Sequence, residues 1–349
     1  MTRALEPPVV VKLGSSLVVD PEGAPRPGVF TDVARELSAL VERGAPVCVV
    51  SSGAIALGAA TAGLTGRRAG RSLAQLQAAS ALGQSELQRL WQEAFEPFGL
   101  PTAQILLTAT EITDRRSYVN VRSSLRALFD VPAVPVLNEN DAVATDEIRF
   151  GDNDVLAAQI AVLVRARLLV LLTSAGGVLS APPEVAGASL LAEGDETAAA
   201  VFGAASPLGA GGMESKVQAA RLAQAGGVTA FVAAPAALGE ILGGSSAGTR
   251  FQAEPVGESA FKLWLRYGMR AAARITIDDG AARALRDSAG SLLAVGVTSC
   301  EPFRAGDGVE VVDPGGGLVA RGIASVDADA VAGRPSGVEV VHRDRMVVA

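Results

Sequence analysis

Residues 8–16 read PVVVKLGSS, a mostly apolar run that gives way to a glycine and two serines. Three later runs have the same form and also end in small or polar residues: APVCVVSSG at 45–53, VPAVPVLNEND at 131–141 and ARLLVLLTSAGG at 166–177. Continuous Val/Leu runs of this length are typical of strands that are buried on both faces of a parallel sheet. The sequence therefore predicts a parallel sheet whose strands carry polar residues at their carboxyl ends.

The segments between these runs have a different period. Phe30–Arg43, Arg71–Phe98 and Val155–Val164 carry apolar residues at helical spacing with polar residues between them. Strands that alternate with such helices indicate βαβ units, so we expect an α/β fold in which helices cover the faces of the sheet.

The pattern changes near the Gly/Ser-rich tract at 243–248, which is typical of a domain boundary. Beyond residue 271 the sequence shows short strands separated by glycine turns, which predicts a small, partly closed β-barrel. We therefore predict a larger domain at 1–250, a linker at 251–270 and a β-rich domain at 271–349.

Composition excludes several classes of function. The 349 residues carry a net charge of −7, which argues against general affinity for nucleic acid or anionic membranes. The two cysteines, Cys48 and Cys300, are far apart, so neither a disulfide framework nor a zinc site is expected. The single histidine, His342, lies near the C-terminus and leaves little scope for histidine chemistry. Without a long apolar run, we expect a cytoplasmic protein that binds its anions locally.

Two polar clusters follow the first two strands. In Lys12–Ser16, Gly14 lets backbone N–H groups approach phosphate oxygens and Lys12 can supply positive charge. Ser51–Ala54 stands at a predicted helix N-terminus, which suits a carboxylate or a phosphate. The simpler interpretations are a solvated lysine and an ordinary serine N-cap.

A third cluster joins Asn138–Asp141 to Gly151–Asp154. Its donors and acceptors could hold the ammonium and α-carboxylate of an amino acid, with Asp141 as the ammonium partner and Asn153 as a donor to the carboxylate. Two Asx turns would explain the residues singly but not their concentration.

The fourth cluster, Gly209–Lys216, leads into an amphipathic stretch. Glycines before a helix, with a lysine at its start, predict an anion site for nucleotide phosphates. A flexible loop is the alternative, and it leaves Lys216 unexplained.

In this order the clusters resemble the amino acid kinase family, and in detail its glutamate 5-kinases. The matching stretches are VVKLGSSL at 10–17, SSGAIALG at 51–58, VPVLNENDAVAT at 134–145, IRFGDNDVLAA at 148–158 and GAGGMESKVQAA at 209–220. GAARALRDSAGSLLAVGV at 280–297 and VHRDRMV at 341–347 look like the PUA domain that many bacterial members carry. The resemblance implies an αβα sandwich around a mainly parallel sheet, followed by a PUA-like barrel.

The resemblance also implies an activity, the ATP- and Mg²⁺-dependent phosphorylation of the γ-carboxylate of L-glutamate, which is the first step of proline synthesis. It assigns phosphoryl stabilisation to Lys12 and Lys216 and glutamate contacts to Ser52, Asp141 and Asn153, with Asp154 as a further candidate. Contacts with the nucleotide are expected from Lys12, Gly14, Thr173, Ser174, Gly211, Gly212, Met213, Glu214, Ser215 and Lys216. No protein cage for the metal is evident, and Mg²⁺ commonly enters bound to phosphates and water.

The chain departs from the family near the nucleotide. Where the family has Thr-Asp followed by Gly-Leu-Tyr-Thr-x-Asp-Pro, this chain has Thr173-Ser174 and then, from Gly177, the residues GVLSAPP. Ala210 also replaces the usual threonine of the glycine loop. These changes put nucleotide affinity and base preference in question.

Three alternatives stay open. Other members of the family phosphorylate different carboxylates, and the fold does not separate them. A catalytically degraded relative with a regulatory role would explain the altered loop, and an RNA-binding protein would use the PUA-like domain, although the acidic balance argues against RNA. The family further implies a homo-oligomer, a dimer or tetramer, and inhibition by proline.

Overall fold

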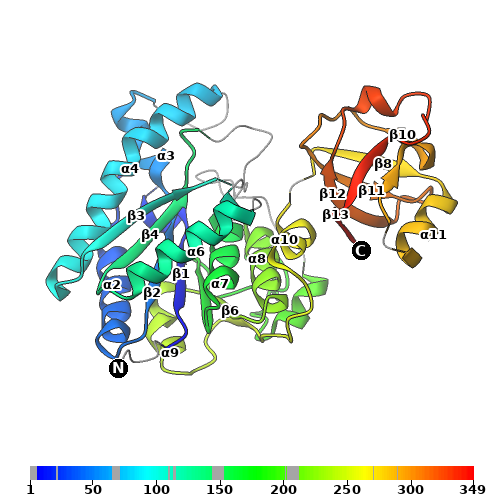
Figure 1. Ribbon diagram of the computed structural model, residues 1–349. Coiled ribbons are helices and arrows are strands. Elements are labelled where there is room, and N and C mark those ends of the chain that lie inside the picture. The colour runs from blue at the N-terminus through cyan, green and yellow to red at the C-terminus, as the bar shows by residue number, and fades with distance from the viewer. Residues whose placement is uncertain are drawn as a thin grey trace. The chain divides into compact units, whose positions relative to one another are not determined.

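Two compact units make up the chain, Met1–Gly257 and Glu258–Ala349 (Figure 1). The computed structural model describes residues 6–20, 23–64, 71–108, 111–112, 115–143, 153–200, 202, 212–269, 271–288 and 290–349. The division between the units falls inside the segment 251–270 that we predicted as a linker. That segment contains the end of strand β7 and two short helices, and the limits of the domains stay a prediction.

A seven-stranded sheet forms the centre of the first unit, in the order β3-β4-β2-β1-β5-β6-β7. All neighbouring strands are parallel except β6 and β7, which are antiparallel. The chain leaves β1 for β2 on one side and later returns to β5 on the other, so the strand order reverses next to β1. The strands are β1 Val9–Leu13, β2 Val47–Ser51, β3 Thr102–Leu107, β4 Val134–Glu139, β5 Leu168–Leu172, β6 Thr229–Ala233 and β7 Thr249–Phe251.

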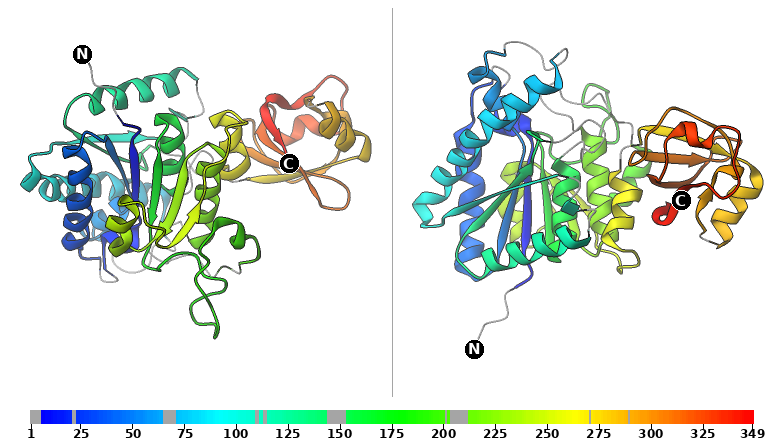
Figure 2. Two further views of the ribbon diagram at one scale, coloured as in Figure 1. Left: turned by 90° about the horizontal axis from the view of Figure 1, so that it is seen from below. Right: turned by 45° about the horizontal axis from the view of Figure 1, so that its top comes forward.

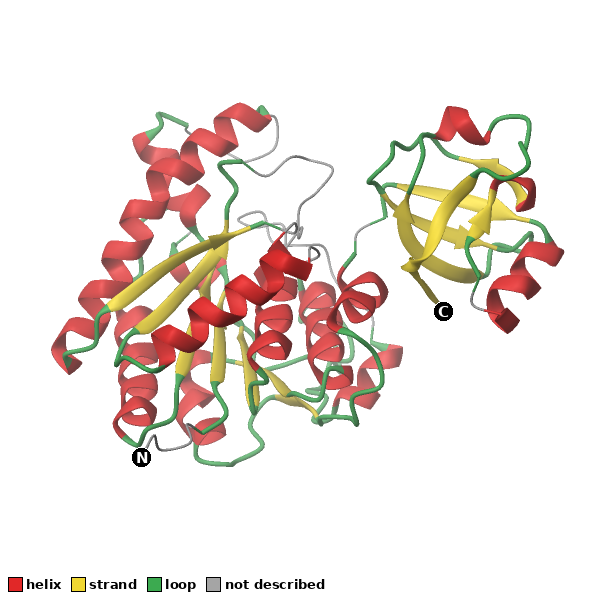
Figure 3. Cartoon of the chain, in the orientation of Figure 1, coloured by secondary structure: helices red, strands yellow, loops and turns green. Residues whose placement is uncertain are grey.

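Helices cover both faces of this sheet, as the views in Figures 1, 2 and 3 show. One face carries α6 Arg115–Phe129, α7 Asn153–Val164 and α8 Met213–Ala225. The other carries α2 Pro27–Glu42, α4 Leu73–Phe95 and α9 Leu238–Leu242. Two short helices, α1 Ser15–Val18 and α3 Ala54–Thr61, directly follow β1 and β2. The predicted αβα sandwich is confirmed.

One hydrophobic core lies between the sheet and helices α2 and α4. Alternate residues of the strands, such as Val9 and Val11, point into it. Phe30 of α2 meets Trp91 of α4 edge to face with 4.8 Å between the ring centres, and Phe95 stacks on the other side of Trp91 at 5.9 Å.

Helices α3 and α4 are in backbone contact. A Cβ atom at Gly58 would lie 1.9 Å from the carbonyl oxygen of Ala79, and one at Gly83 would lie 1.8 Å from that of Ala54. Only glycine fits at either position, because such distances are far below van der Waals contact. The N-terminus of α4 is fixed by a capping box between Ser72 and Gln75.

A six-stranded sheet, in the order β10-β8-β11-β12-β13-β9, curls around the core of the second unit (Figure 3). Only β8 and β11 pair in parallel. This confirms the predicted β-rich second fold. Its elements are α10 Ala260–Leu263, a turn of π-helix at Trp264–Gly268, β8 Ala273–Ile277, α11 Asp279–Ser288, β9 Leu292–Leu293, β10 Val297–Cys300, β11 Gly308–Val312, β12 Leu318–Ala324 and β13 Glu339–Val348.

The cysteines differ in environment. Cys48 is buried in β2, where burial raises the pKa of its thiol far above the ordinary range, and Cys300 is exposed on β10. Within the described part of the chain, no helix is both long and apolar enough to cross a membrane.

Candidate active site

The carboxyl ends of β1, β2, β4 and β5 meet at one edge of the sheet, because these four strands are parallel neighbours. Helices α3, α7 and α8 begin at the same edge. Three of the four predicted clusters place described residues there: Lys12–Ser16, Ser51–Ala54 and the segment around Asn138. The described part of the fourth cluster, Gly212–Lys216, is linked to them by ion pairing.

Two lysines converge on one carboxylate at this edge. The Nζ atom of Lys12 lies 2.7 Å from Oδ1 of Asp154, and the Nζ atom of Lys216 lies 3.0 Å from Oδ2. The Asp154 side chain has no exposed surface, and those of Lys12 and Lys216 are 3% and 11% exposed. Val11 and Leu13 face the α2 side, so Lys12 between them points to the α7 side, where Asp154 begins the helix.

Among the described residues, two ammonium groups face a single carboxylate in a buried place, where charge is costly to keep. The chain contains only three lysines among its 30 basic residues, and two of them are here. Lys216 also lies in the first turn of α8, where the helix dipole disfavours a cation. These costs indicate a site built for an anion.

The start of α8 strengthens this positive potential. Gly212 occupies the N-cap without a side-chain cap, so the first N–H groups of the helix can serve an anionic ligand. The hydroxyl of Ser215 lies 3.0 Å from Asp154 Oδ2 and 3.1 Å from the Gly212 carbonyl oxygen, which ties the helix start to the lysine cluster.

An uncharged network lies beside the lysines. The Nδ2 group of Asn153 donates to Ser52 Oγ at 3.1 Å and to Asn138 Oδ1 at 2.8 Å, and its Oδ1 accepts from the Glu139 backbone N–H at 3.0 Å. All four residues are buried. The network joins the ends of β2 and β4 to the start of α7, so the amide and hydroxyl groups are held in fixed positions.

Asp141 follows β4 by two residues, and its Oδ2 accepts a hydrogen bond from the hydroxyl of Ser80 on α4 at 3.3 Å. The structure therefore brings Lys12, Ser52, Asp141, Asn153, Asp154 and Lys216 to one edge of the sheet. It places Asp154 between the two lysines, a position that the sequence did not indicate.

Comparison with known proteins identifies the families that this chain matches. The model of the amino acid kinase family matches residues 7–234, and that of the PUA domain matches residues 273–343. The glutamate 5-kinase of Sphingopyxis alaskensis is 41% identical, covering 98% of this chain and 97% of its own. That of Pseudomonas entomophila is 40% identical over 97% of both chains, and that of Mycobacterium avium is 41% identical over 93% of this chain and 89% of its own.

The chain belongs to the amino acid kinase family.

Residues expected to contact the nucleotide in this amino acid kinase lie around the lysines and at the end of β5. A Cβ atom at Gly14 would be 3.7 Å from Lys12 Nζ and 3.9 Å from the Leu172 carbonyl oxygen, so this glycine lies beside the ammonium group between β1 and β5. Thr173 is buried and its N–H donates to Ala233, while Ser174 is exposed. Met213 and Glu214 open α8, and Gly211 lies outside the described residues.

The altered nucleotide loop is held by Thr249 of β7. Its hydroxyl accepts from the Val178 N–H at 2.8 Å and lies 2.6 Å from the Leu191 carbonyl oxygen. Gly177 packs against the same side chain, since a Cβ atom at this glycine would lie 2.8 Å from Thr249 Oγ1. Thr249 is completely buried. The segment after β5 therefore has a defined support in this amino acid kinase, although the family's acidic residues are missing.

Sequence reasoning did not find every polar residue at the site. Asn138 stood within a predicted cluster but was not assigned a role, and Ser80 and Gln84 were not noticed. A usable sign was present, because Ser80 and Gln84 are polar residues one turn apart on the buried side of the predicted helix Arg71–Phe98.

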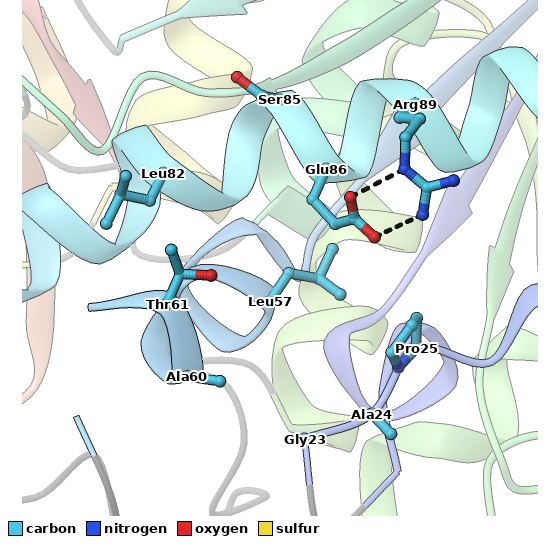
Figure 4. A pocket seen from close by; sticks show the side chains of 10 residues that line it. All are labelled: Gly23, Ala24, Pro25, Leu57, Ala60, Thr61, Leu82, Ser85, Glu86 and Arg89. Carbon is cyan, nitrogen blue, oxygen red and sulfur yellow. Dashed lines mark hydrogen bonds and ion pairs between the residues drawn. The ribbon is translucent and has the colours of Figure 1, made fainter. Parts of the chain in front are cut away.

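A separate cavity of about 630 Å³ lies against α3, α4 and the turn at 23–25 (Figure 4). Leu57 and Leu82 contribute apolar surface, and Glu86 and Arg89 form an ion pair at its side. None of the predicted site residues lines this cavity.

Proposed function

We propose that this chain transfers the γ-phosphoryl group of ATP to the side-chain carboxylate of L-glutamate and forms L-glutamyl 5-phosphate, the first intermediate of proline synthesis. The observation that carries the proposal is the buried pair of lysines on Asp154, set beside the network of Ser52, Asn138 and Asn153. Its support in the comparisons is the match to glutamate 5-kinases over nearly the whole chain.

The chemistry requires no base from the protein. A glutamate side chain is ionised at neutral pH, so one of its oxygens can attack the γ-phosphorus directly. The new O–P bond forms as the bond between the γ-phosphorus and the bridging oxygen breaks, and ADP leaves with that electron pair. A site for this reaction needs to align the two reactants and offset negative charge.

Lys12 and Lys216 supply that positive charge. They come from β1 and α8, and Asp154 holds both ammonium groups at 2.7 and 3.0 Å. A phosphoryl group bound at the two lysines would accept charge-assisted hydrogen bonds from both ammonium groups. Asp154 thus acts as a positioning residue for the two catalytic lysines. The first N–H groups of α8, from Gly212 to Ser215, would bind the nucleotide phosphates together with Gly14, Gly211, Thr173 and Ser174.

Glutamate would bind at the neighbouring network. Asn153 and Ser52 can contact its α-carboxylate, and the Asp141 carboxylate can bind its ammonium group. Magnesium would enter with ATP, where it neutralises phosphate charge. No cluster of three potential metal ligands occurs among the described residues.

Turnover in the presence of hydroxylamine tests the proposal, because hydroxylamine traps an acyl phosphate as a hydroxamate. The purified full chain with ATP and Mg²⁺ should form hydroxamate from L-glutamate and far less from L-aspartate or N-acetyl-L-glutamate. Preference for another acceptor would keep the kinase and replace the substrate. No product from any acceptor would overturn the proposal and favour a non-catalytic role.

We extend the proposal to a cytoplasmic homo-oligomer that proline inhibits. Light scattering on the purified chain tests the dimer or tetramer, and proline added to the hydroxamate assay tests the inhibition. RNA binding by the second unit has less support, because acidic residues outnumber basic ones in residues 271–349.

A further inference from the structure

Two polar side chains on α4 are buried next to the proposed glutamate pocket. Ser80 is 0% exposed and Gln84 is 8% exposed. They are four residues apart, so both project from the same side of the helix. A buried polar group is costly without a partner, so what these two contact is informative.

Both side chains contact the segment that follows β4. Ser80 donates to the Asp141 carboxylate at 3.3 Å, and Gln84 Nε2 lies 3.5 Å from the Glu139 carbonyl oxygen. Both distances are at the long end of the range for hydrogen bonds. One helix side therefore contacts both ends of the segment 139–141.

The orientation of the Gln84 amide follows from this contact. A backbone carbonyl can only accept, so Gln84 must present its NH₂ group to Glu139. Its Oε1 atom is then buried without a donor among the described residues. A glutamine half satisfied in this way lowers stability, which suggests that it is kept for its effect on the segment 139–141.

Gly83, one helical turn from Ser80, contacts the segment that follows β2. Gly83 packs against the Ala54 carbonyl oxygen at the start of α3, two residues after Ser52. Gly53, between Ser52 and Ala54, has φ +108° and lies against Val18, so this turn has little conformational freedom. Through these contacts α4 fixes both Ser52 and Asp141.

We infer that Ser80 and Gln84 are positioning residues for amino acid selectivity, with Ser80 setting the direction of the Asp141 carboxylate toward the substrate ammonium group. This rests on the proposed function, because it assumes that Asp141 binds that group. Substitution of Ser80 or Gln84 should therefore weaken the binding of ligands that carry an ammonium group and leave the binding of ligands without one unchanged.

The test compares Ser80→Ala with the wild-type full chain in the hydroxamate assay. We expect KM for L-glutamate to rise by about tenfold, the loss typical of a hydrogen bond to a charged group, while kcat and KM for ATP stay within about twofold. Glutarate, which is glutamate without its ammonium group, serves as a competitive inhibitor, and its inhibition constant should be unchanged. Gln84→Leu should act in the same direction.

Ser38→Ala is the matched control, because Ser38 is a serine on α2 that is 1% exposed and whose hydroxyl has no partner among the described residues. It should leave every constant unchanged. Ser80→Cys keeps the volume of the side chain and a weak donor, so it carries the test if Ser80→Ala does not fold, and its KM should lie between those of the wild type and Ser80→Ala.

The outcomes separate the two proposals. An unchanged KM for glutamate in Ser80→Ala and Ser80→Cys, or an equal loss of glutamate and glutarate binding, would overturn the positioning role and leave the kinase intact. A wild-type chain that neither binds nor phosphorylates glutamate would overturn the proposed function, and this inference with it.

Discussion

The lysine cluster of the first unit and two exposed ion pairs of the second show two uses of charge. At the sheet edge, Lys12, Lys216 and Asp154 are nearly or completely buried, and two ammonium groups share one carboxylate among the described residues. In the second unit, Arg286 pairs with Asp313 and Arg334 with Asp278, one to one, with side chains between 25% and 49% exposed.

The difference separates functional charge from structural charge. Exposed pairs are screened by water and salt and contribute little to stability, so they can be gained or lost at small cost. A buried charged cluster lowers stability unless a ligand binds it. A buried cluster of this kind is therefore expected at a ligand-binding site, where the bound ligand offsets its cost in stability.

The largest expected effect is on catalysis. Lys216→Ala should lower kcat by about 10³-fold, because one of two charges that stabilise the transferred group is lost. It should change stability little, since Asp154 keeps its pair with Lys12. Lys262→Ala removes the remaining, exposed lysine and should keep full hydroxamate formation. If the two variants were equally active, the buried lysine cluster would have no role in catalysis.

A second substitution should affect folding most. Asp154→Asn removes the carboxylate that pairs with both buried ammonium groups and should cost about 3–5 kcal/mol in the free energy of unfolding, measured by urea titration. Adding Lys12→Met should restore part of that loss, because the repulsion is removed. If the double variant were less stable than Asp154→Asn alone, repulsion between the two ammonium groups would not be the source of the loss.

Gln159 on α7 tests whether every buried polar group in this unit serves function. Both of its amide atoms are buried without a partner among the described residues, and its side chain is fully buried. Gln159→Leu should raise the free energy of unfolding by about 1 kcal/mol and leave kcat unchanged. Lower activity with higher stability would show that Gln159 belongs with the lysine cluster.

The smallest expected effect is on the stability of the second unit at acidic pH. The backbone N–H of Ala281 holds the pKa of Asp278 below its usual range, and Arg334 adds to this. A lowered pKa in the folded state gives stability that is present above the ordinary Asp pKa of about 3.9 and is lost as the pH falls through the folded value.

Asp278→Ala should therefore lower the stability of the second unit at pH 7 by about 1 kcal/mol, the usual cost of losing a helix N-cap. Thermal melts of the full chain should show this difference shrinking below about pH 4. Asp279→Ala, a change at the exposed neighbour, is the control. A difference of the same size at pH 7 and at pH 2 would mean that the Asp278 charge does not cause it.

Much of the fold followed from local pattern. The Val/Leu runs identified β1, β2, β4 and β5, because strands buried on both faces need continuous apolar residues. The same criterion missed β3, whose side chains are mostly half-buried, and the short antiparallel β7. Helical spacing predicted α2, α4 and α7 to within a few residues.

The site was predicted less completely, because its contacts join distant segments. The four clusters could be found one by one, but the pairing of Asp154 with both lysines depends on where α7 and α8 begin above β1. The polar residues Ser80 and Gln84 were hidden in an amphipathic helix, since periodicity does not say what a helix side contacts. The closeness of α3 and α4 at Gly58 and Gly83 is likewise a tertiary fact.

The unequal environments of the two cysteines give the protein a natural attachment point for a probe. The thiol of Cys48 is buried in β2 and its high pKa keeps it protonated, so a maleimide should not modify it in the folded chain. Cys300 on β10 is exposed, and a fluorophore would attach there alone without any engineered substitution. Energy transfer from such a dye to a fluorescent ATP analogue would report whether the distance between the second unit and the bound nucleotide changes during turnover.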